Sequence, residues 1–273
     1  MLKGIAYHQD SWVQSDKLYV HISDLSIHRA YAVFDYMKEK KGKVPWIDAY
    51  LDRFFRSLNL AGIGITQTKQ EVHDLIHDMI RQNGFGISGI KLLATGGYSP
   101  NGFTVPDQSN FFILNYKGKQ IDPVIYQNGI VLIHDDFQRP NPEIKTTQYF
   151  NTAQLYQKML KHKADDVLYH HHGIITETSR ANFYVIKNGG IRTSGGHILS
   201  GITRKNFLKT FKDKYPIDLG DLYFSDLKNI DEAFITSTTR GVVPVVKIED
   251  LLIGNGEVGS ITKKLMAQFN DKY

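Results

Sequence analysis

Apolar residues recur at helical spacing in a stretch close to the N-terminus. The stretch comprises Leu51, Phe54, Phe55 and Leu58. Residues three and four positions apart lie on one face of a helix, so this spacing predicts a helix with an apolar stripe. Arg53 falls off that stripe.

A second helix is predicted to start at Thr68. Thr68-Lys69-Gln70-Glu71 has the form of a capping box, in which the threonine and the glutamate each bond the other's backbone N–H. Asn83-Gly84 supplies the stop, because glycine readily takes the left-handed conformation that ends a helix. The inward-facing positions between these ends are Val72, Leu75, Ile76, Met79 and Ile80.

Short apolar runs bounded by Gly, Pro and Asn predict strands. They are expected at residues 90–95, 111–115, 129–134, 167–169, 183–186 and 232–236. Asn188-Gly189-Gly190 predicts a hairpin turn into a further strand. Further helices are expected at residues 150–163, 202–214 and 260–269.

Mixed helices and strands in two blocks predict a two-domain α/β (α+β) enzyme. The segment around residues 118–123 is polar and breaks both periods. We therefore expect a small N-terminal α/β domain at residues 1–117, a linker at 118–123, and a larger C-terminal domain at 124–273.

Composition excludes several classes of protein. Hydrophobic content of 41% and charged content of 22% are ordinary for a globular protein. The chain has no cysteine, so disulfides, thiolate metal ligands and a thiol nucleophile are ruled out. No apolar run approaches the length of a membrane span, and the N-terminus lacks an apolar signal core. We expect a cytoplasmic protein.

The net charge of +5 does not indicate nucleic-acid binding. Lysines and arginines are spread along the chain and interleaved with acids, which favours a solvated surface over a nucleic-acid patch. His170-His171-His172 is not read as a metal tract, because three consecutive side chains diverge. We expect a turn between two strands there, and no metal.

Three features in the second half of the chain carry chemistry. Lys145 offers an amine, Glu177 a carboxylate, and the Leu199 to Arg204 turn an anion cradle before a helix. An aldehyde cofactor that carries a phosphate and a ring nitrogen would need all three. Taken singly, a lysine or a glutamate is usually solvated surface, so the order and context carry the prediction.

These residues and their neighbours resemble the fold-type IV pyridoxal-phosphate enzymes. That group comprises branched-chain aminotransferases, D-amino-acid aminotransferases and aminodeoxychorismate lyases. The likeness extends over nearly the whole chain, and it implies a larger pseudo-barrel C-terminal domain and a homodimer. The matching segments are residues 33–35, 51–53, 56–57, 145–151, 164–166, 176–183, 199–204, 236–239 and 244–245.

The resemblance implies that Lys145 holds pyridoxal 5′-phosphate as a Schiff base and then moves the proton between Cα and C4′. Such a lysine must spend time unprotonated, so its pKa must fall from about 10.4. Glu177 would face the pyridine nitrogen and keep it protonated. Leu199 would pack on the ring face. Tyr149 would bond near the phenolic oxygen or the phosphate, with a core position as the equal alternative.

The phosphate would be bound at the start of the helix after Gly201. Unpaired N–H groups at Gly201 and Ile202, with the Thr203 hydroxyl, suit an anion. Ser237 and Thr238 would add a second contact, and Arg53 would supply charge. Relatives have a histidine three residues before that arginine, where this chain has Tyr50.

Substrate recognition is where the chain departs from its relatives. D-amino-acid aminotransferases and the lyases commonly have an arginine where this chain has Gly96, so a bidentate clamp for a substrate carboxylate is missing. Spacing does not choose a substitute among Arg29, Lys38, Arg139, Arg180 and Arg240. The expected pocket residues are Tyr31, Phe34, Tyr36 and Thr239.

Three functions stay open at this point. The first is an aminotransferase that exchanges an amino group between an amino acid and a 2-oxo acid. The second is a lyase that splits aminodeoxychorismate into 4-aminobenzoate and pyruvate, because Arg240-Gly241-Val242 leans toward that subgroup. The third is a cofactor-binding protein without turnover. The L or D preference of the substrate is not readable.

Overall fold

The protein was analysed as a computed structural model, which describes residues 4–118 and 120–270. Its contacts divide the chain into two units. Unit 1 comprises Met1–Gln120 with Ile144–Gln148, and unit 2 comprises Ile121–Glu143 with Tyr149–Tyr273. The chain thus leaves unit 2 for five residues around Lys145 and returns.

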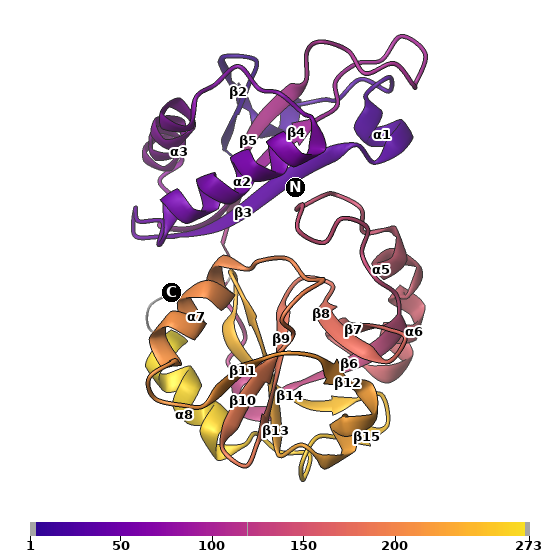
Figure 1. Ribbon diagram of the computed structural model, residues 1–273. Helices are drawn as coiled ribbons and strands as arrows, with labels where there is room; N and C mark the ends of the chain where they lie inside the picture. The colour runs from indigo at the N-terminus through magenta and orange to yellow at the C-terminus, as the bar shows by residue number, and fades with distance from the viewer. Residues whose placement is uncertain (1–3, 119, 271–273) are drawn as a thin grey trace. The chain divides into compact units, whose positions relative to one another are not determined.

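Unit 1 is built on one antiparallel sheet (Figure 1) with the strand order β2-β1-β5-β4-β3. The strands are β1 (Ile5–His8), β2 (Ser11–Gln14), β3 (Ala32–Lys40), β4 (Ile87–Thr95) and β5 (Asn110–Lys117). β3 and β4 pair over their full length, from Ala32 opposite Thr95 to Lys40 opposite Ile87. Alternate residues of these strands therefore face opposite sides.

Helices α2 (Ile47–Ala61) and α3 (Lys69–Asn83) contact the sheet of unit 1. Both have the apolar stripe that the spacing predicted, with Leu51 and Phe54 fully buried in α2. The Thr68 capping box is present and Gly84 caps the end in the left-handed region, so both predicted signals are confirmed. Two short helical segments complete this unit: η1 (Ser15–Lys17) and α1 (Leu25–Arg29).

Unit 2 contains a closed ring of strands (Figure 1) in the order β9-β13-β14-β6-β7-β8, with β8 pairing back to β9. Glu177 opposite Asn182 makes that closing pair. The ring strands are β6 (Ile130–Asp136), β7 (Asp166–His171), β8 (Ile174–Thr178), β9 (Asn182–Lys187), β13 (Glu232–Ser237) and β14 (Gly241–Ile248). The predicted pseudo-barrel is confirmed.

Further strands and a 3₁₀ helix extend the ring. They are β10 (Gly190–Thr193), β11 (Ile217–Leu219), β12 (Leu222–Tyr223), β15 (Leu251–Leu252) and η2 (Phe224–Asn229). Asn188 and Gly189 join β9 to β10 with positive φ at both positions, which confirms the predicted hairpin turn.

Both faces of β9 and β13 are buried, which explains their continuous apolar runs. One face contributes to a cluster that includes Phe183, Val185 and Ile235. On the other, Tyr184 stacks on Phe234, and helices α7 (Ile202–Phe211) and α8 (Ser260–Phe269) pack against β13.

Two helix predictions differ from the structure. The single helix expected at 150–163 is two helices, α5 (Phe150–Gln154) and α6 (Tyr156–His162), interrupted at Leu155. Leu155 packs with the cluster of Ile133, Val167 and Tyr169, and this tertiary contact has no local sequence signal. Helix α7 ends at Phe211, before Pro216, rather than at residue 214. The short helix α4 (Val124–Asn128) was not expected.

Candidate functional site

The backbone around Lys145 is fixed within unit 1 by hydrogen bonds on two sides. Phe34 N–H donates to the Lys145 carbonyl at 2.9 Å, and Thr147 N–H donates to the Ala32 carbonyl at 3.2 Å. On the other side, Lys145 N–H donates to the Ser57 hydroxyl of α2 at 3.3 Å. The domain prediction places residues 144–148 in the C-terminal domain. These hydrogen bonds to β3 and α2 place them in unit 1 instead.

The Lys145 amine lies over an aromatic ring. Its Nζ is 4.6 Å from the centroid of the Phe34 ring. Phe34 and Tyr36 are on the same face of β3 and both are half-buried. Burial raises the pKa of the Tyr36 hydroxyl. The structure therefore places two of the expected pocket residues, Phe34 and Tyr36, on the sheet face over which the Lys145 amine lies.

Arg53 of α2 is held by a buried carboxylate. Its Nε and Nη2 donate to the two oxygens of Asp35 at 2.8 and 2.6 Å, and the Asp35 side chain is fully buried. The Arg53 guanidinium also lies 5.5 Å from the Tyr50 ring centroid. The pair fixes the orientation of the guanidinium. The role of Arg53 at a phosphate stays a prediction.

Glu177 of β8 forms the matching buried pair in unit 2. Arg139 donates to Glu177 Oε1 through Nε at 2.9 Å and through Nη2 at 2.8 Å. The exposed fractions of the two side chains are 12% and 6%, so solvent screens the pair little. Leu199 N–H donates to the other oxygen, Oε2, at 3.0 Å.

The turn before α7 is held beside Glu177 by hydrogen bonds to Leu199. Asn182 Nδ2 donates to the Leu199 carbonyl at 3.0 Å. A Cβ on Gly201 would lie 2.2 Å from Asn182 Oδ1, so no larger residue fits there without displacing that side chain. Leu199 therefore contacts both Glu177 and Asn182, and Gly201 lies against Asn182; the roles of these residues at a cofactor stay predictions.

Helix α7 begins at Ile202 without a side-chain cap on its first N–H groups. The Thr203 hydroxyl is buried and has no hydrogen-bond partner among the residues described. Ser237 Oγ, at the end of β13, is likewise buried and has no hydrogen-bond partner among the described residues. Both hydroxyls are therefore available to donate to a bound anion, and their role at a phosphate stays a prediction.

Tyr149 and Thr239 differ in burial. Burial raises the pKa of the Tyr149 phenol, Arg139 lowers it, and Glu177 raises it. Tyr149 therefore lies beside the Arg139–Glu177 pair. Thr238 is half-buried in the turn after β13, whereas Thr239 is exposed. The roles of these residues at cofactor or substrate stay predictions.

Gly96 is required by the ring of Tyr31. A Cβ at position 96 would lie 2.3 Å from Tyr31 Cδ1 and 3.1 Å from Leu25 Cβ. The Tyr31 hydroxyl donates to the Ala61 carbonyl at 2.7 Å, which fixes the ring there. An arginine cannot replace Gly96 while Tyr31 keeps this position.

The candidate cations for a substrate carboxylate, in place of an arginine at position 96, differ in their contacts within the protein. Arg139 is engaged by Glu177. Arg180 and Arg240 lie 3.7 and 4.0 Å from a carboxylate oxygen of the buried Asp166. Arg29 is exposed, with its guanidinium 4.1 Å from the Phe103 ring centroid.

The histidine run lies where β7 turns into β8. His170 and His171 belong to the end of β7, and His172 and Gly173 form the turn with positive φ. Within residues 4–118 and 120–270, no group of three or more His, Asp or Glu side chains could hold a metal ion. Across the same residues, none of the helices has the length and apolar character needed to cross a membrane.

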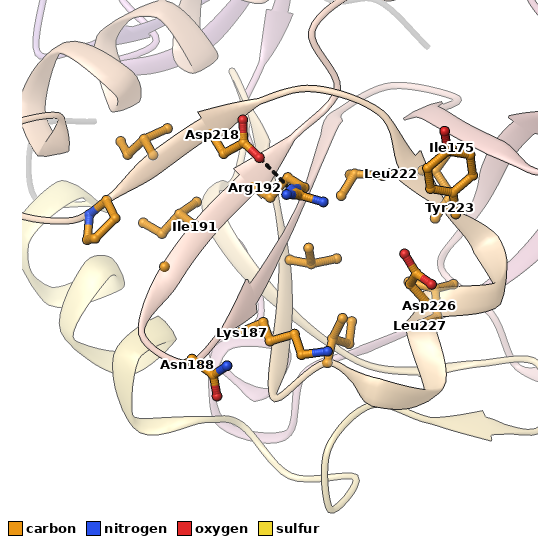
Figure 2. A pocket seen from close by; sticks show the side chains of 15 residues that line it. Ile175, Lys187, Asn188, Ile191, Arg192, Asp218, Leu222, Tyr223, Asp226 and Leu227 are labelled. Carbon is orange, nitrogen blue, oxygen red and sulfur yellow. Dashed lines mark ion pairs between the residues drawn. The ribbon is translucent and has the colours of Figure 1, made fainter.

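A cavity of about 640 Å³ lies elsewhere in unit 2, between β9 and β10 on one side and β12 and η2 on the other. Figure 2 shows Leu222 and Leu227 among its apolar lining residues, and the Arg192–Asp218 ion pair also lines the cavity. None of the predicted site residues lines this cavity. We assign no role to it.

The sequence reasoning missed the ion-pair partners of two predicted site residues, namely Asp35 beside Arg53 and Arg139 beside Glu177. Asp35 was noted only as part of a motif, and Arg139 only as a possible clamp. Lys91 was not considered, although strand alternation places it on the face opposite to the buried Ile90 and Leu92.

Comparisons with known proteins agree with this geometry. The family model described as Amino-transferase class IV matches residues 32–248. The D-alanine aminotransferase of Staphylococcus haemolyticus is 28% identical over 245 residues, which is 87% of this chain and 86% of that protein. A putative branched-chain-amino-acid aminotransferase of Methanocaldococcus jannaschii is 28% identical over 279 residues, covering 97% and 95%.

Solved structures share the fold. The T.th. branched-chain amino acid aminotransferase, solved with pyridoxamine 5′-phosphate, superposes with a TM-score of 0.89 at 21% identity, covering 97% of this chain and 92% of that one. The Escherichia coli branched-chain enzyme gives 0.89 at 20% identity, with 97% and 93% covered. With the family match, these findings show that the chain belongs to the class IV aminotransferases, enzymes that use pyridoxal phosphate.

Proposed function

We propose that the protein transfers an amino group between an amino acid with an apolar side chain and a 2-oxo acid, with Lys145 as the reacting amine. The observation that carries this proposal is the fixed position of Lys145 over Phe34, on a sheet face that also bears Tyr36 and Leu93. An apolar substituent would be favoured on such a face because its burial removes apolar surface from water.

Pyridoxal phosphate supplies an aldehyde for the amine and a ring that accepts electrons from the substrate Cα. Lys145 anchors it and moves the proton at Cα. The hydrogen bonds to Phe34 and Ser57 hold the Lys145 backbone, so only the side chain has to move between these tasks. Such positioning lowers the entropic part of the barrier.

Glu177 is assigned to the ring nitrogen of the cofactor. Arg139 uses only Oε1, and Leu199 N–H bonds Oε2, so the carboxylate is held at both oxygens. Arginine keeps its charge at all accessible pH values and stabilises the ionised carboxylate beside it. An ionised Glu177 in turn favours the protonated ring nitrogen.

The residues around the start of α7 fit a phosphate group. Thr203 and Ser237 offer buried hydroxyls that lack partners within the described part of the chain. The N-terminus of α7 adds unpaired N–H groups and a favourable dipole. We assign Gly201, Ile202 and Thr203, with Ser237 and Thr238, to the phosphate, and Arg53 as its cation.

The relatives named above are aminotransferases for D-alanine and for branched-chain amino acids, which supports transfer over the lyase reaction. They differ in substrate, so the choice between L and D donors belongs to experiment.

We further propose a homodimer formed through one surface of unit 1. Residues 18–30 and the loop 96–109 lie side by side, because Leu25 N–H bonds the Gly97 carbonyl and Ser99 N–H bonds the Ser23 carbonyl. Exposed apolar groups gather on these two segments, which we call the 18–105 patch, and such groups commonly mark an interface. The patch comprises Tyr19, Ile22, Ile27, Tyr98, Phe103 and Val105.

A panel of L- and D-amino acids tests the reaction. With a 2-oxo acid present, at least one apolar donor should convert to its oxo acid and change the cofactor absorbance. A spectrum that no donor changes would favour a protein that binds the cofactor without turnover. Pyruvate released from aminodeoxychorismate without an added 2-oxo acid, and no transfer, would favour the lyase.

Substitution of the anchor should abolish both turnover and covalent attachment. Lys145→Ala should lower kcat by at least about a hundredfold, because it removes the acid–base group at Cα. After borohydride treatment, mass spectrometry should find the cofactor attached to the wild type and absent from the variant. Lys161→Ala, an exposed lysine of α6, is the control. Attachment that persists in Lys145→Ala would show that another lysine is the anchor.

Removal of Arg139 should destabilise unit 2. Arg139→Met leaves the buried Glu177 carboxylate without its cation, and we expect a loss of about 3 kcal/mol in the free energy of unfolding. Urea unfolding of the cofactor-free protein measures this without ligand linkage. Arg192→Met is the control, because its pair with Asp218 is exposed and should contribute less than about 1 kcal/mol. Equal losses in the two variants would contradict the argument.

A charge in the 18–105 patch should dissociate the dimer. Sedimentation velocity should give twice the 31.1 kDa chain mass for the wild type. Ile27→Glu places a carboxylate on the patch and should give the monomer mass. Leu252→Glu, on an exposed residue of unit 2, should remain dimeric. A wild type that is monomeric at micromolar concentration would end the proposal.

A further inference from the structure

Lys91 occupies the face of the unit 1 sheet that also carries Phe34 and Tyr36. Along β4 the side chains of Ile90 and Leu92 are fully buried, so Lys91, between them, points to the other side. The strand register sets Lys91 opposite Tyr36 of β3. Two neighbouring strands thus hold the Lys91 side chain on this face.

No carboxylate among the described residues balances the charge of Lys91. The residue is half-buried, and over residues 4–118 and 120–270 it has no carboxylate partner. Burial alone lowers its pKa. Lys91 makes a cation–π contact with Phe34, because its Nζ lies 4.9 Å from the centroid of the Phe34 ring. A half-buried ammonium without an acid is costly, and an anion from outside would offset the cost.

Lys91 and Lys145 share that ring. Their amine nitrogens lie 4.9 and 4.6 Å from the Phe34 centroid, so the two nitrogens are at most 9.5 Å apart. In an α-amino acid, the carboxylate and the amino group are bonded to the same carbon. One substrate molecule can therefore span the interval, with its amino group near Lys145 and its carboxylate at Lys91.

Position 96 cannot supply this cation. The Tyr31 ring fills the space that a side chain at Gly96 would enter. Lys38, on the same face of β3, is half-buried as well, but the structure records no contact between it and Phe34. Lys91 is the lysine that shares a ring with the reacting amine.

We propose that Lys91 binds the α-carboxylate of the amino acid and 2-oxo acid substrates. The proposal rests on the proposed function, since it takes Lys145 as the reacting amine. A single ammonium makes a point contact rather than the bidentate fork of an arginine. It therefore fixes the position of the carboxylate and leaves its rotation to the aromatic side chains.

Binding without turnover tests the proposal directly. The probes are 4-methylvalerate and its uncharged amide, titrated calorimetrically into the holoenzyme. The wild type should bind the acid at least about tenfold more tightly than the amide, because charge-assisted contacts are the stronger ones. Lys91→Met should lose this preference by weakening acid binding alone, and Lys91→Arg should keep most of it. Lys117→Met, an exposed lysine at the end of β5, should match the wild type.

Turnover supplies the second readout. For the best donor of the amino acid panel, Lys91→Met should raise KM by about tenfold or more with a smaller change in kcat, as expected for lost ground-state binding. A Lys91→Met variant with wild-type acid binding but a shifted pH profile would mean that Lys91 acts on Lys145 instead. That result would overturn the proposal.

Two further results would also overturn it: equal affinity of the wild type for acid and amide, or no binding of either. A failure of the proposed function is distinguishable from these. In that case the wild type would transfer no amino group from any donor, whatever the acid and amide titrations show. Circular dichroism of Lys91→Met guards against a folding defect as the cause of lost binding.

Discussion

The hydrogen bonds that tie residues 144–148 to β3 and α2 are the constraint on which the proposed chemistry depends. They are made by backbone groups and by the buried Ser57 hydroxyl, so they fix the Lys145 backbone without using its side chain. The amine is then placed over Phe34 by the geometry of one sheet edge. A lysine on a flexible loop would have to lose backbone conformational entropy each time its amine reached the reacting position.

Two buried ion pairs among the described residues orient candidate functional groups. Asp35 holds Arg53 through two bonds, and Arg139 holds Glu177 through two bonds. Such pairs contribute little net stability, because desolvation offsets most of the attraction. Their effect is geometric: each leaves a charged group in one rotamer. Lys91 differs from Arg53 and Arg139, because no carboxylate among the described residues pairs with it and burial lowers its pKa. This difference supports the proposal that Lys91 binds an anion from outside the protein.

Elements with local rules could be predicted from sequence, and elements set by distant contacts could not. The capping box at Thr68, the Asn188-Gly189 turn and the bounds of α8 follow from neighbouring residues. The strand β14 escaped prediction because it contains Pro244. Its pairing with β6 begins only at Val245, so the missing N–H costs no ladder bond on that side. Ion-pair partners such as Arg139 lie 38 positions from Glu177, and no periodicity links them.

The same distinction separates the proposed cofactor residues from the proposed substrate residues. Lys145 and Glu177 were proposed because motif context surrounds them. The carboxylate-binding group could not be found that way, because the residue that relatives use is absent at Gly96. The structure gives a steric reason for that absence. The Tyr31 ring occupies the space beside Gly96, and the Tyr31 hydroxyl donates to the Ala61 carbonyl. The proposed carboxylate contact then needs a cation at another position, and strand register places Lys91 of β4 on the Phe34 face to supply it.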